Sequence, residues 1–301
     1  MPGAFDAVHR RISPGFTAHL PGRAPARVYT WTGTGFHVRC APVLRYNAAA
    51  MPTAPLRRPD LLADQRDRPP FGRRQFRAGD PPVRAGITGS GADMLLLAWS
   101  ASDLAREIAA GARVLGALGV RAGTRVGNTL PGALATPGAL LLGDVNEALG
   151  ALDVPLGVID GEAAARAAWE LADRVRCEIL VLDPITAPTM FLAAPGVERP
   201  WWRGIVWLER GEGQPKAAPP DSFVGWQRAW LAVPEVASFA GGTCERGRMH
   251  ADTGVTVDVV DGRLVLAADG SAASGPFDTG MAAHRVACAC GAAGTALELA
   301  W

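Results

Sequence analysis

Cysteine and histidine residues in the C-terminal part of the chain have the spacing of a metal site. Cys244 is followed after five residues by His250, and one residue separates Cys288 from Cys290. Three thiolates and one imidazole form the ligand set of a closed tetrahedral zinc site. Cys288 and Cys290 are too close in sequence for a comfortable disulfide with each other. The spacing predicts structural zinc, with buried free thiols as the alternative and His284 as a reserve ligand.

The stretch "RAGITGSGAD" (84–93) has the residue types of a phosphate-binding loop. Backbone N–H groups of a glycine-rich turn can surround a phosphate, and hydroxyls such as those of Thr88 and Ser90 can add hydrogen bonds. The stretch has no lysine, and Lys216, the only lysine of the chain, falls in a predicted surface loop. The stretch is therefore either an ordinary glycine-rich turn or a phosphate loop without its usual positive charge.

Hydrophobic periodicity predicts an α/β sheet around these residues. Helices are expected over 101–120, 138–152 and 161–176, and strands over 124–130, 154–159, 177–183 and within 201–213. Alternating helices and strands are typical of a sheet with helical crossovers. For the first helix, Ser102 or Asp103 is the expected N-cap and Gly119 the expected end. After residue 236 the pattern becomes that of strands, and Asp261-Gly262 predicts a two-residue hairpin turn.

These patterns predict three parts of the chain. Residues 1–83 are expected to be an irregular segment packed on the core, 84–236 an α/β core and 237–301 a β-rich zinc-binding part. A loop and a short helix are expected within 51–76.

The composition excludes several classes of protein. The chain has 301 residues, 49% of them hydrophobic, and a net charge of +1, which argues against nucleic-acid or acidic membrane surfaces as partners. Neither a membrane-spanning stretch nor a secretory signal is visible. The five cysteines, an odd number, favour a reducing compartment. We therefore expect a cytoplasmic protein, with homodimer formation left open.

In their order, these segments resemble the phenylacetate–coenzyme A ligase branch of the adenylate-forming (acyl-CoA synthetase) superfamily. The matching segments, from about residue 51 to 294, are "MPTAPLRRPDLLADQRDRPPFG", "RAGITGSGAD", "LGVRAGTRVGNTL", "TPGALLLGDVNEALGALDVPLG", "CEILVLDP", "GEG", "CERGRMH", "FDTGM" and "CACG". The resemblance implies the N-terminal region of an adenylate-forming enzyme, with a helix-covered sheet and a zinc-tied C-terminal β part. We expect a truncated and degenerate member without the C-terminal lid domain, which carries a catalytic lysine in the family.

Three nucleotide motifs of the family are altered in this chain. The family's loop ends in Gly-Lys, whereas this chain has Gly89 and Ser90. The family's Tyr-Arg-Thr-Gly-Asp, whose aspartate resembles a clamp for the ribose hydroxyls, matches residues 277–281, which end in Met281. The family's magnesium-binding Thr-Glu pair is missing at its expected offset. The resemblance therefore makes the use of ATP and Mg²⁺ doubtful.

Positions in the family imply a substrate site or former nucleotide site, to which no catalytic residue can be assigned. Its members would be Thr88, Gly89, Ser90, Asn128, Thr129, Thr136, Gly138, Gly211, Glu212, Phe239, Glu245, Asp278 and Thr279. The first hypothesis is a divergent protein that has lost adenylation and binds or transforms a small acyl or aryl carboxylate or thioester in a biosynthetic pathway. The alternatives are a minimal ATP-dependent ligase that needs a partner protein, and a non-catalytic scaffold subunit.

Overall fold

The computed structural model describes residues 54–75, 79–130, 137–211 and 215–300. By its internal contacts the chain divides into Met1–Leu44 and Arg45–Trp301, and all described residues belong to the second unit. No helix in the described ranges is long and apolar enough to cross a membrane.

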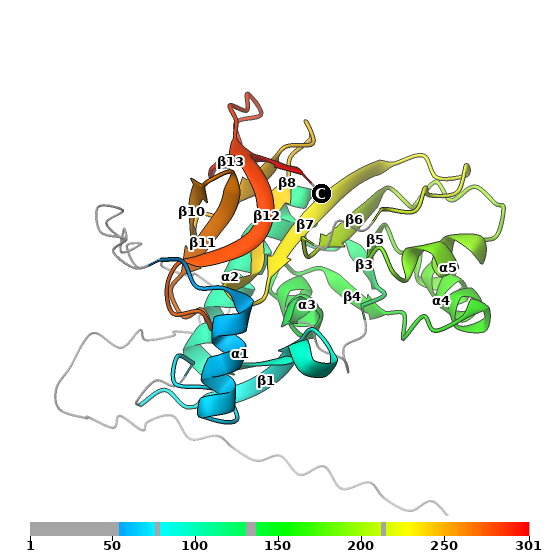
Figure 1. Ribbon diagram of the computed structural model, residues 1–301. Coiled ribbons are helices and arrows are strands. Elements are labelled where there is room, and N and C mark those ends of the chain that lie inside the picture. The colour runs from blue at the N-terminus through cyan, green and yellow to red at the C-terminus, as the bar shows by residue number, and fades with distance from the viewer. Residues whose placement is uncertain (1–53, 76–78, 131–136, 212–214, 301) are drawn as a thin grey trace, which may run out of the picture. The chain divides into compact units, whose positions relative to one another are not determined.

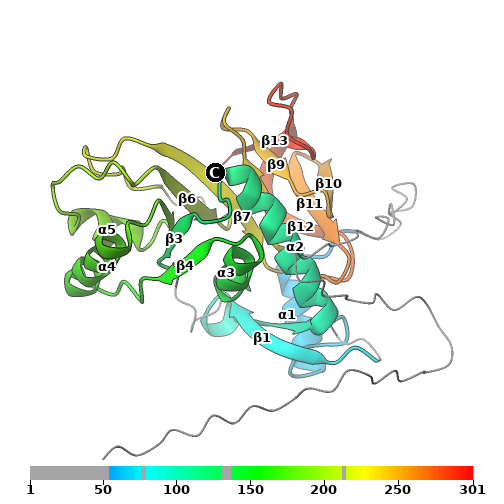
Figure 2. The same ribbon diagram turned by 180° about the vertical axis from the view of Figure 1, so that it is seen from behind.

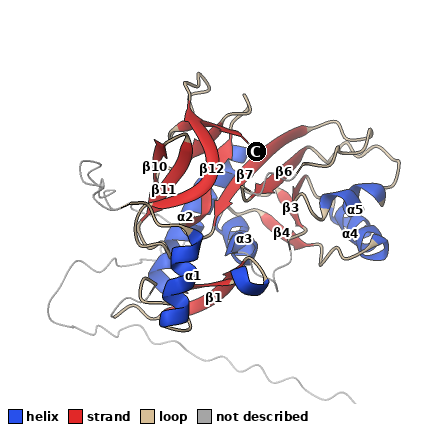
Figure 3. Ribbon diagram, viewed as in Figure 1, coloured by secondary structure: helices blue, strands red, loops and turns tan. Residues whose placement is uncertain are grey.

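A mixed sheet of eleven strands forms the centre of this unit (Figures 1 and 3). Its strand order is β10-β11-β12-β13-β9-β8-β7-β6-β5-β3-β4. The strands from β7 to β4 in this order are parallel to one another, and the others pair antiparallel. Their bounds are β3 Arg125–Asn128, β4 Leu152–Pro155, β5 Ile179–Leu182, β6 Gly204–Glu209, β7 Trp226–Val233, β8 Ala237–Thr243, β9 Met249–Ala251, β10 Val255–Val260, β11 Arg263–Ala268, β12 Phe277–Arg285 and β13 Ala296–Ala300.

Helices cover both faces of the parallel part of the sheet (Figure 2). The helices are α2 (Ala101–Leu118) and α3 (Pro137–Ala148) on one face, and α4 (Glu162–Val175) and α5 (Ala187–Leu192) on the other. The four residues of β5 alternate between the two hydrophobic cores. Ile179 and Val181 pack with α2 and α3, whereas Leu180 and Leu182 pack with α4 and α5. This alternation follows from the period of two in a strand, and it confirms the predicted α/β architecture.

The helix ends show which local signals are used. The expected helix at 101–120 is α2, and Gly119 ends it in the left-handed conformation, as predicted. The predicted N-cap was wrong, because the cap is Ser100, whose hydroxyl accepts a hydrogen bond from the Asp103 amide. Asp103 completes the capping box from the third position of the helix.

The strand expected at 154–159 begins earlier, at Leu152. The preceding helix α3 ends at Ala148, and Gly150, with a φ of 70°, turns the chain. Leu152 then pairs with Arg125 of β3. The turn at Gly150 therefore brings the chain back to the sheet two residues before the start of the strand predicted at 154–159.

The C-terminal part is β-rich, and its strands extend the same sheet. Strand β8 pairs antiparallel with β7, so the sheet continues through residue 236. The hairpin between β10 and β11 turns at Asp261 and Gly262, with φ values of 50° and 74°. Both positive values are those of a type I′ turn, which confirms the predicted hairpin.

A small antiparallel sheet and one helix lie before the main sheet in sequence. Strand β1 (Pro82–Thr88) contains the first half of the glycine-rich stretch, and the 3-10 turn η1 (Gly91–Asp93) ends it. Strand β2 (Leu95–Ser100) follows and pairs antiparallel with β1. Helix α1 (Arg58–Asp67) is the short helix expected within 51–76, and it packs on β2.

Candidate functional site

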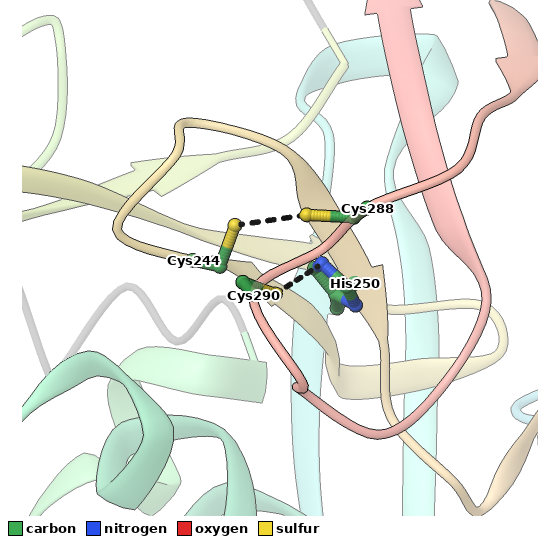
Figure 4. A group of neighbouring side chains, drawn as sticks. All are labelled: Cys244, His250, Cys288 and Cys290. Carbon is green, nitrogen blue, oxygen red and sulfur yellow. Dashed lines mark hydrogen bonds between the residues drawn. The ribbon is translucent and has the colours of Figure 1, made fainter.

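The four predicted metal ligands come from two regions of sequence that the sheet brings together (Figure 4). Cys244 begins the turn between β8 and β9, and His250 lies on β9. Cys288 and Cys290 lie between β12 and β13. Strand β9 pairs with both β8 and β13, so the two regions become neighbours.

The ligand atoms have the separations expected around one metal ion. The Sγ atoms of Cys244 and Cys288 are 3.7 Å apart, and Cys290 Sγ is 3.3 Å from Nε2 of His250. All four ligand atoms lie within 4.8 Å of one another. Tetrahedral zinc with ordinary bond lengths would place its ligands about 3.5 to 3.8 Å apart. The group could therefore hold a metal ion, whereas the reserve ligand His284 is outside it, exposed on β12.

Local hydrogen bonds favour a thiolate at one of these cysteines. Burial alone would raise the pKa of Cys244, but backbone hydrogen bonds from Arg246 and Arg248, and the neighbouring thiols, lower it overall. A thiolate is the form that binds metal. The imidazole of His250 is buried, and its Nδ1 has no hydrogen-bond partner among the described residues. Its Nε2 faces the cysteines.

A second site is a cavity of about 470 Å³ between β1, β6, the β7–β8 connection, β12 and the start of α1. Its wall includes the middle of the glycine-rich stretch, at Thr88 and Gly89, and the two residues that follow β6. The lining residues are Arg57, Arg58, Pro59, Thr88, Gly89, Arg210, Gly211, Val233, Pro234, Glu235, Arg263, Phe277, Asp278, Thr279, Gly280 and Met281.

Arg58 occupies the glycine-rich side of this cavity. Its guanidinium donates hydrogen bonds to the carbonyl oxygens of Thr88, at 2.7 Å, and Asp93, at 2.6 Å. It also forms an ion pair with Glu235, whose side chain is 8% exposed. Any side chain at Gly89 would overlap this guanidinium. The stretch therefore presents carbonyl oxygens to an arginine of the same chain.

Asp278 is also engaged by arginines. Its Oδ2 lies 3.2 Å from Nε of Arg57 and 3.5 Å from Nη2 of Arg263, and its Oδ1 accepts a hydrogen bond from the Gly280 amide. Met281 is buried against Gly211, where an added Cβ would lie 2.5 Å from the methionine sulfur. The thioether thus fills the space beside the turn that follows β6.

Five of the predicted site residues line this cavity: Thr88, Gly89, Gly211, Asp278 and Thr279. Ser90 is exposed next to them as the N-cap of η1, and Gly138 lies in the first turn of α3. Thr136 and Glu212 lie outside the described residues.

Four other predicted residues, all described, lie outside the lining of this cavity. The side chains of Asn128 and Thr129 bond within the protein, to the Leu130 amide and the Val181 carbonyl. Phe239 stacks on Trp230 in the core with ring centroids 4.5 Å apart. Glu245 is exposed in the turn that begins with Cys244.

The sequence patterns did not identify the arginines. Arg57, Arg58, Arg210 and Arg263 come from three separate regions of sequence, and only the adjacent pair in "LRRPD" stands out as basic. Lys216, expected in a surface loop, forms an ion pair with the buried carboxylate of Glu209 at the end of β6.

Comparisons with known proteins give structural matches only. No family model and no curated protein matches the sequence. A 2-hydroxyisobutyryl-CoA ligase, whose structure holds 2-HIB-AMP and CoA, matches with a TM-score of 0.68 and 15% identity over 82% of this chain and 62% of that one. The N-terminal domain of FACL13 from Mycobacterium tuberculosis matches with a TM-score of 0.55 and 16% identity, over 74% of this chain and 60% of that chain.

The amide bond synthetase McbA from Marinactinospora thermotolerans also matches, with a TM-score of 0.52 and 14% identity over 72% of this chain and 48% of that one. The chain thus spans less than two thirds of the length of each of these three structures. At these identities the matches show a shared fold. The large mixed sheet with its helices is the fold of adenylate-forming enzyme domains.

Proposed function

We propose that this chain has the fold of adenylate-forming enzymes but does not adenylate, and that its cavity binds a small acyl or aryl carboxylate or thioester. The observation that carries this proposal is that both carboxylates lining the cavity are bound by arginines of the chain. Glu235 pairs with Arg58, and Asp278 is shared between Arg57 and Arg263. The positive charge of the paired arginine offsets that of the carboxylate, so each carboxylate attracts the hydroxyl groups of a nucleotide less strongly than a free one would.

Met281 supports the same proposal. The resemblance places the ribose-binding aspartate of the family at this position, and a thioether is only a weak hydrogen-bond acceptor. Two buried hydroxyls without acceptors would cost roughly 1 to 3 kcal/mol each. Met281 also packs against Gly211, so a ribose there would have to displace it.

The competing proposal is ATP-dependent ligation. The 2-hydroxyisobutyryl-CoA ligase of the same fold holds an acyl adenylate and CoA. Such a role would require ATP to displace Arg58 from the glycine-rich stretch, where it makes two hydrogen bonds and an ion pair.

Calorimetry with ATP and Mg²⁺, together with pyrophosphate exchange in the presence of a panel of acyl and aryl carboxylates, distinguishes the proposals. We expect no ATP binding up to millimolar concentration, no exchange, and binding of at least one carboxylate. Micromolar ATP binding with carboxylate-dependent exchange would replace our proposal with the ligase. If neither ATP nor any carboxylate binds, the proposal fails and a scaffold role is favoured.

We also propose that the Cys/His group holds structural zinc. The Cys₃His donor set and the 3.3 to 3.7 Å contacts support a closed site in which all four positions are filled by protein. Metal analysis of protein purified without chelator should give about one zinc per chain. Cys288→Ser should lower this content severalfold, and unchanged content would refute the assignment.

A further inference from the structure

The cavity walls carry more positive than negative charge. The ionisable residues that line it are Arg57, Arg58, Arg210, Arg263, Glu235 and Asp278. Arg58 and Glu235 neutralise each other, and Asp278 is shared by two arginines, Arg57 and Arg263. The shared carboxylate leaves one positive charge on that group of three. Arg210 adds another, so the cavity carries two positive charges in excess.

Arg210 is available to a ligand because the adjacent carboxylate, Glu209, is paired with Lys216. Glu209, the preceding residue, is buried and forms an ion pair with Lys216. Arg210 itself is half-buried and makes no ion pair with any residue in the described ranges. A guanidinium with five N–H donors in a partly buried site is well suited to bind carboxylate or phosphate oxygens.

Arg263 is the second anchor. It lies at the start of β11 and shares Asp278 at the longer of the two distances, 3.5 Å against 3.2 Å for Arg57. Its side chain is 43% exposed, which leaves guanidinium N–H groups free to face the cavity. The single charge of Asp278 cannot neutralise both Arg57 and Arg263. An anionic group bound at Arg263 would neutralise the positive charge that remains.

We infer that the cavity selects a small molecule with two negative charges. Arg210 binds one negatively charged oxygen of this dianion and Arg263 binds another. This inference rests on the proposed function and specifies the charge of the ligand: the molecule carries two negative charges, on a second carboxylate or on a phosphate group. A dicarboxylate and a phosphate monoester share this chemistry. The volume of about 470 Å³ is suited to a small metabolite.

Calorimetry on the full chain with matched probes tests the inference. The probes are succinate, methyl phosphate and butyrate, which has the same four-carbon chain as succinate but one charge less. The second negative charge gains a charge-assisted hydrogen bond, so we expect at least one dianion to bind at least about tenfold more tightly than butyrate. Comparing the affinities for succinate and methyl phosphate then shows whether the site prefers a dicarboxylate or a phosphate monoester.

Arginine variants identify the contacts. Arg210→Gln and Arg263→Gln should each weaken binding of the dianion about tenfold and bring it close to that of butyrate. Arg174→Gln, on the exposed side of α4, is the matched control and should leave the affinity unchanged. Thermal unfolding of each variant verifies that it is folded.

The outcomes separate the inference from the proposed function. Equal binding of butyrate and both dianions overturns the selection of dianions and leaves carboxylate binding intact. An equal loss in Arg174→Gln also overturns it, because the effect would then arise from net charge. ATP binding with pyrophosphate exchange refutes the proposed function and the inference together. If none of the three probes binds, the inference fails alone, and the panel of acyl and aryl carboxylates still decides the proposed function.

Discussion

The half-buried side chain of Glu107 should make the stability of this protein depend on pH. Glu107 lies on α2, and its Oε2 accepts a hydrogen bond from the Ser238 amide on β8 at 3.0 Å. Burial raises the pKa of Glu107 from 4.5 to about 7, against the smaller lowering effects of the Ser238 hydrogen bonds and Arg106. The folded state therefore holds a proton that the unfolded state has already released at neutral pH.

The sign of the effect follows from proton linkage. Between about pH 4.5 and pH 7 the folded state binds more protons than the unfolded state, so the free energy of unfolding falls as pH rises through this range. Above about pH 7 the contribution of Glu107 to the free energy of unfolding no longer changes with pH. Each unit of pKa difference corresponds to about 1.4 kcal/mol, so the total loss is about 3 kcal/mol. Glu107→Gln removes the ionisation and should remove this loss.

Urea unfolding at pH 5, 6, 7 and 8 measures the effect. We expect Glu107→Gln to exceed the parent protein in unfolding free energy by about 1 to 3 kcal/mol at pH 8 and by less than about 0.5 kcal/mol at pH 5. Glu170→Gln, at an exposed site on α4, is the control and should follow the parent protein. Parallel curves for the parent protein and Glu107→Gln would refute the argument, since Glu107 would then ionise alike in both states.

Three further perturbations test other parts of the structure. Ser100→Ala removes the N-cap of α2 and should lower the unfolding free energy by about 1 kcal/mol in urea titrations, whereas no change would show that the cap is dispensable. Asp252→Asn weakens the bidentate pair with Arg113, at 2.7 and 2.8 Å, and should cost about 2 kcal/mol in the same assay; a neutral result would mean that the pair adds no stability. A chelator should lower the melting temperature of the parent protein but not that of Cys288→Ser, and equal shifts would argue against a zinc-stabilised fold.

The sequence predicts most elements of the fold because their signals are local. Helix α2 has apolar residues at helical spacing and a glycine at its end, and the Asp261-Gly262 hairpin needs only two residues with positive φ. The N-cap at Ser100 was missed because three polar residues close together can each cap a helix, and backbone geometry decides among them. The order of eleven strands depends on pairings between distant segments, which no local pattern contains.

The two candidate sites differ in how well the sequence predicts them. Cysteine and histidine are rare residues whose chemistry limits their roles, so the spacing of the metal group is informative from the sequence alone. The arginines of the cavity are typical surface residues in an arginine-rich chain. Only the pairing of β11 with β12 brings Arg263 to Asp278, and only the position of α1 brings Arg58 to the glycine-rich stretch.

The absence of lysine from the glycine-rich stretch does not by itself show that the stretch lacks a positive charge. The absence of lysine there suggests that the positive charge is lost, yet Arg58, which lies thirty residues before Thr88, returns a guanidinium to the same place. That guanidinium is held by two carbonyl oxygens and by Glu235, so its charge is used within the protein. The net charge of the cavity is set instead by Arg210 and by the sharing of Asp278 between two arginines. A ligand of this site is therefore selected by the charges that remain after the internal pairs are counted.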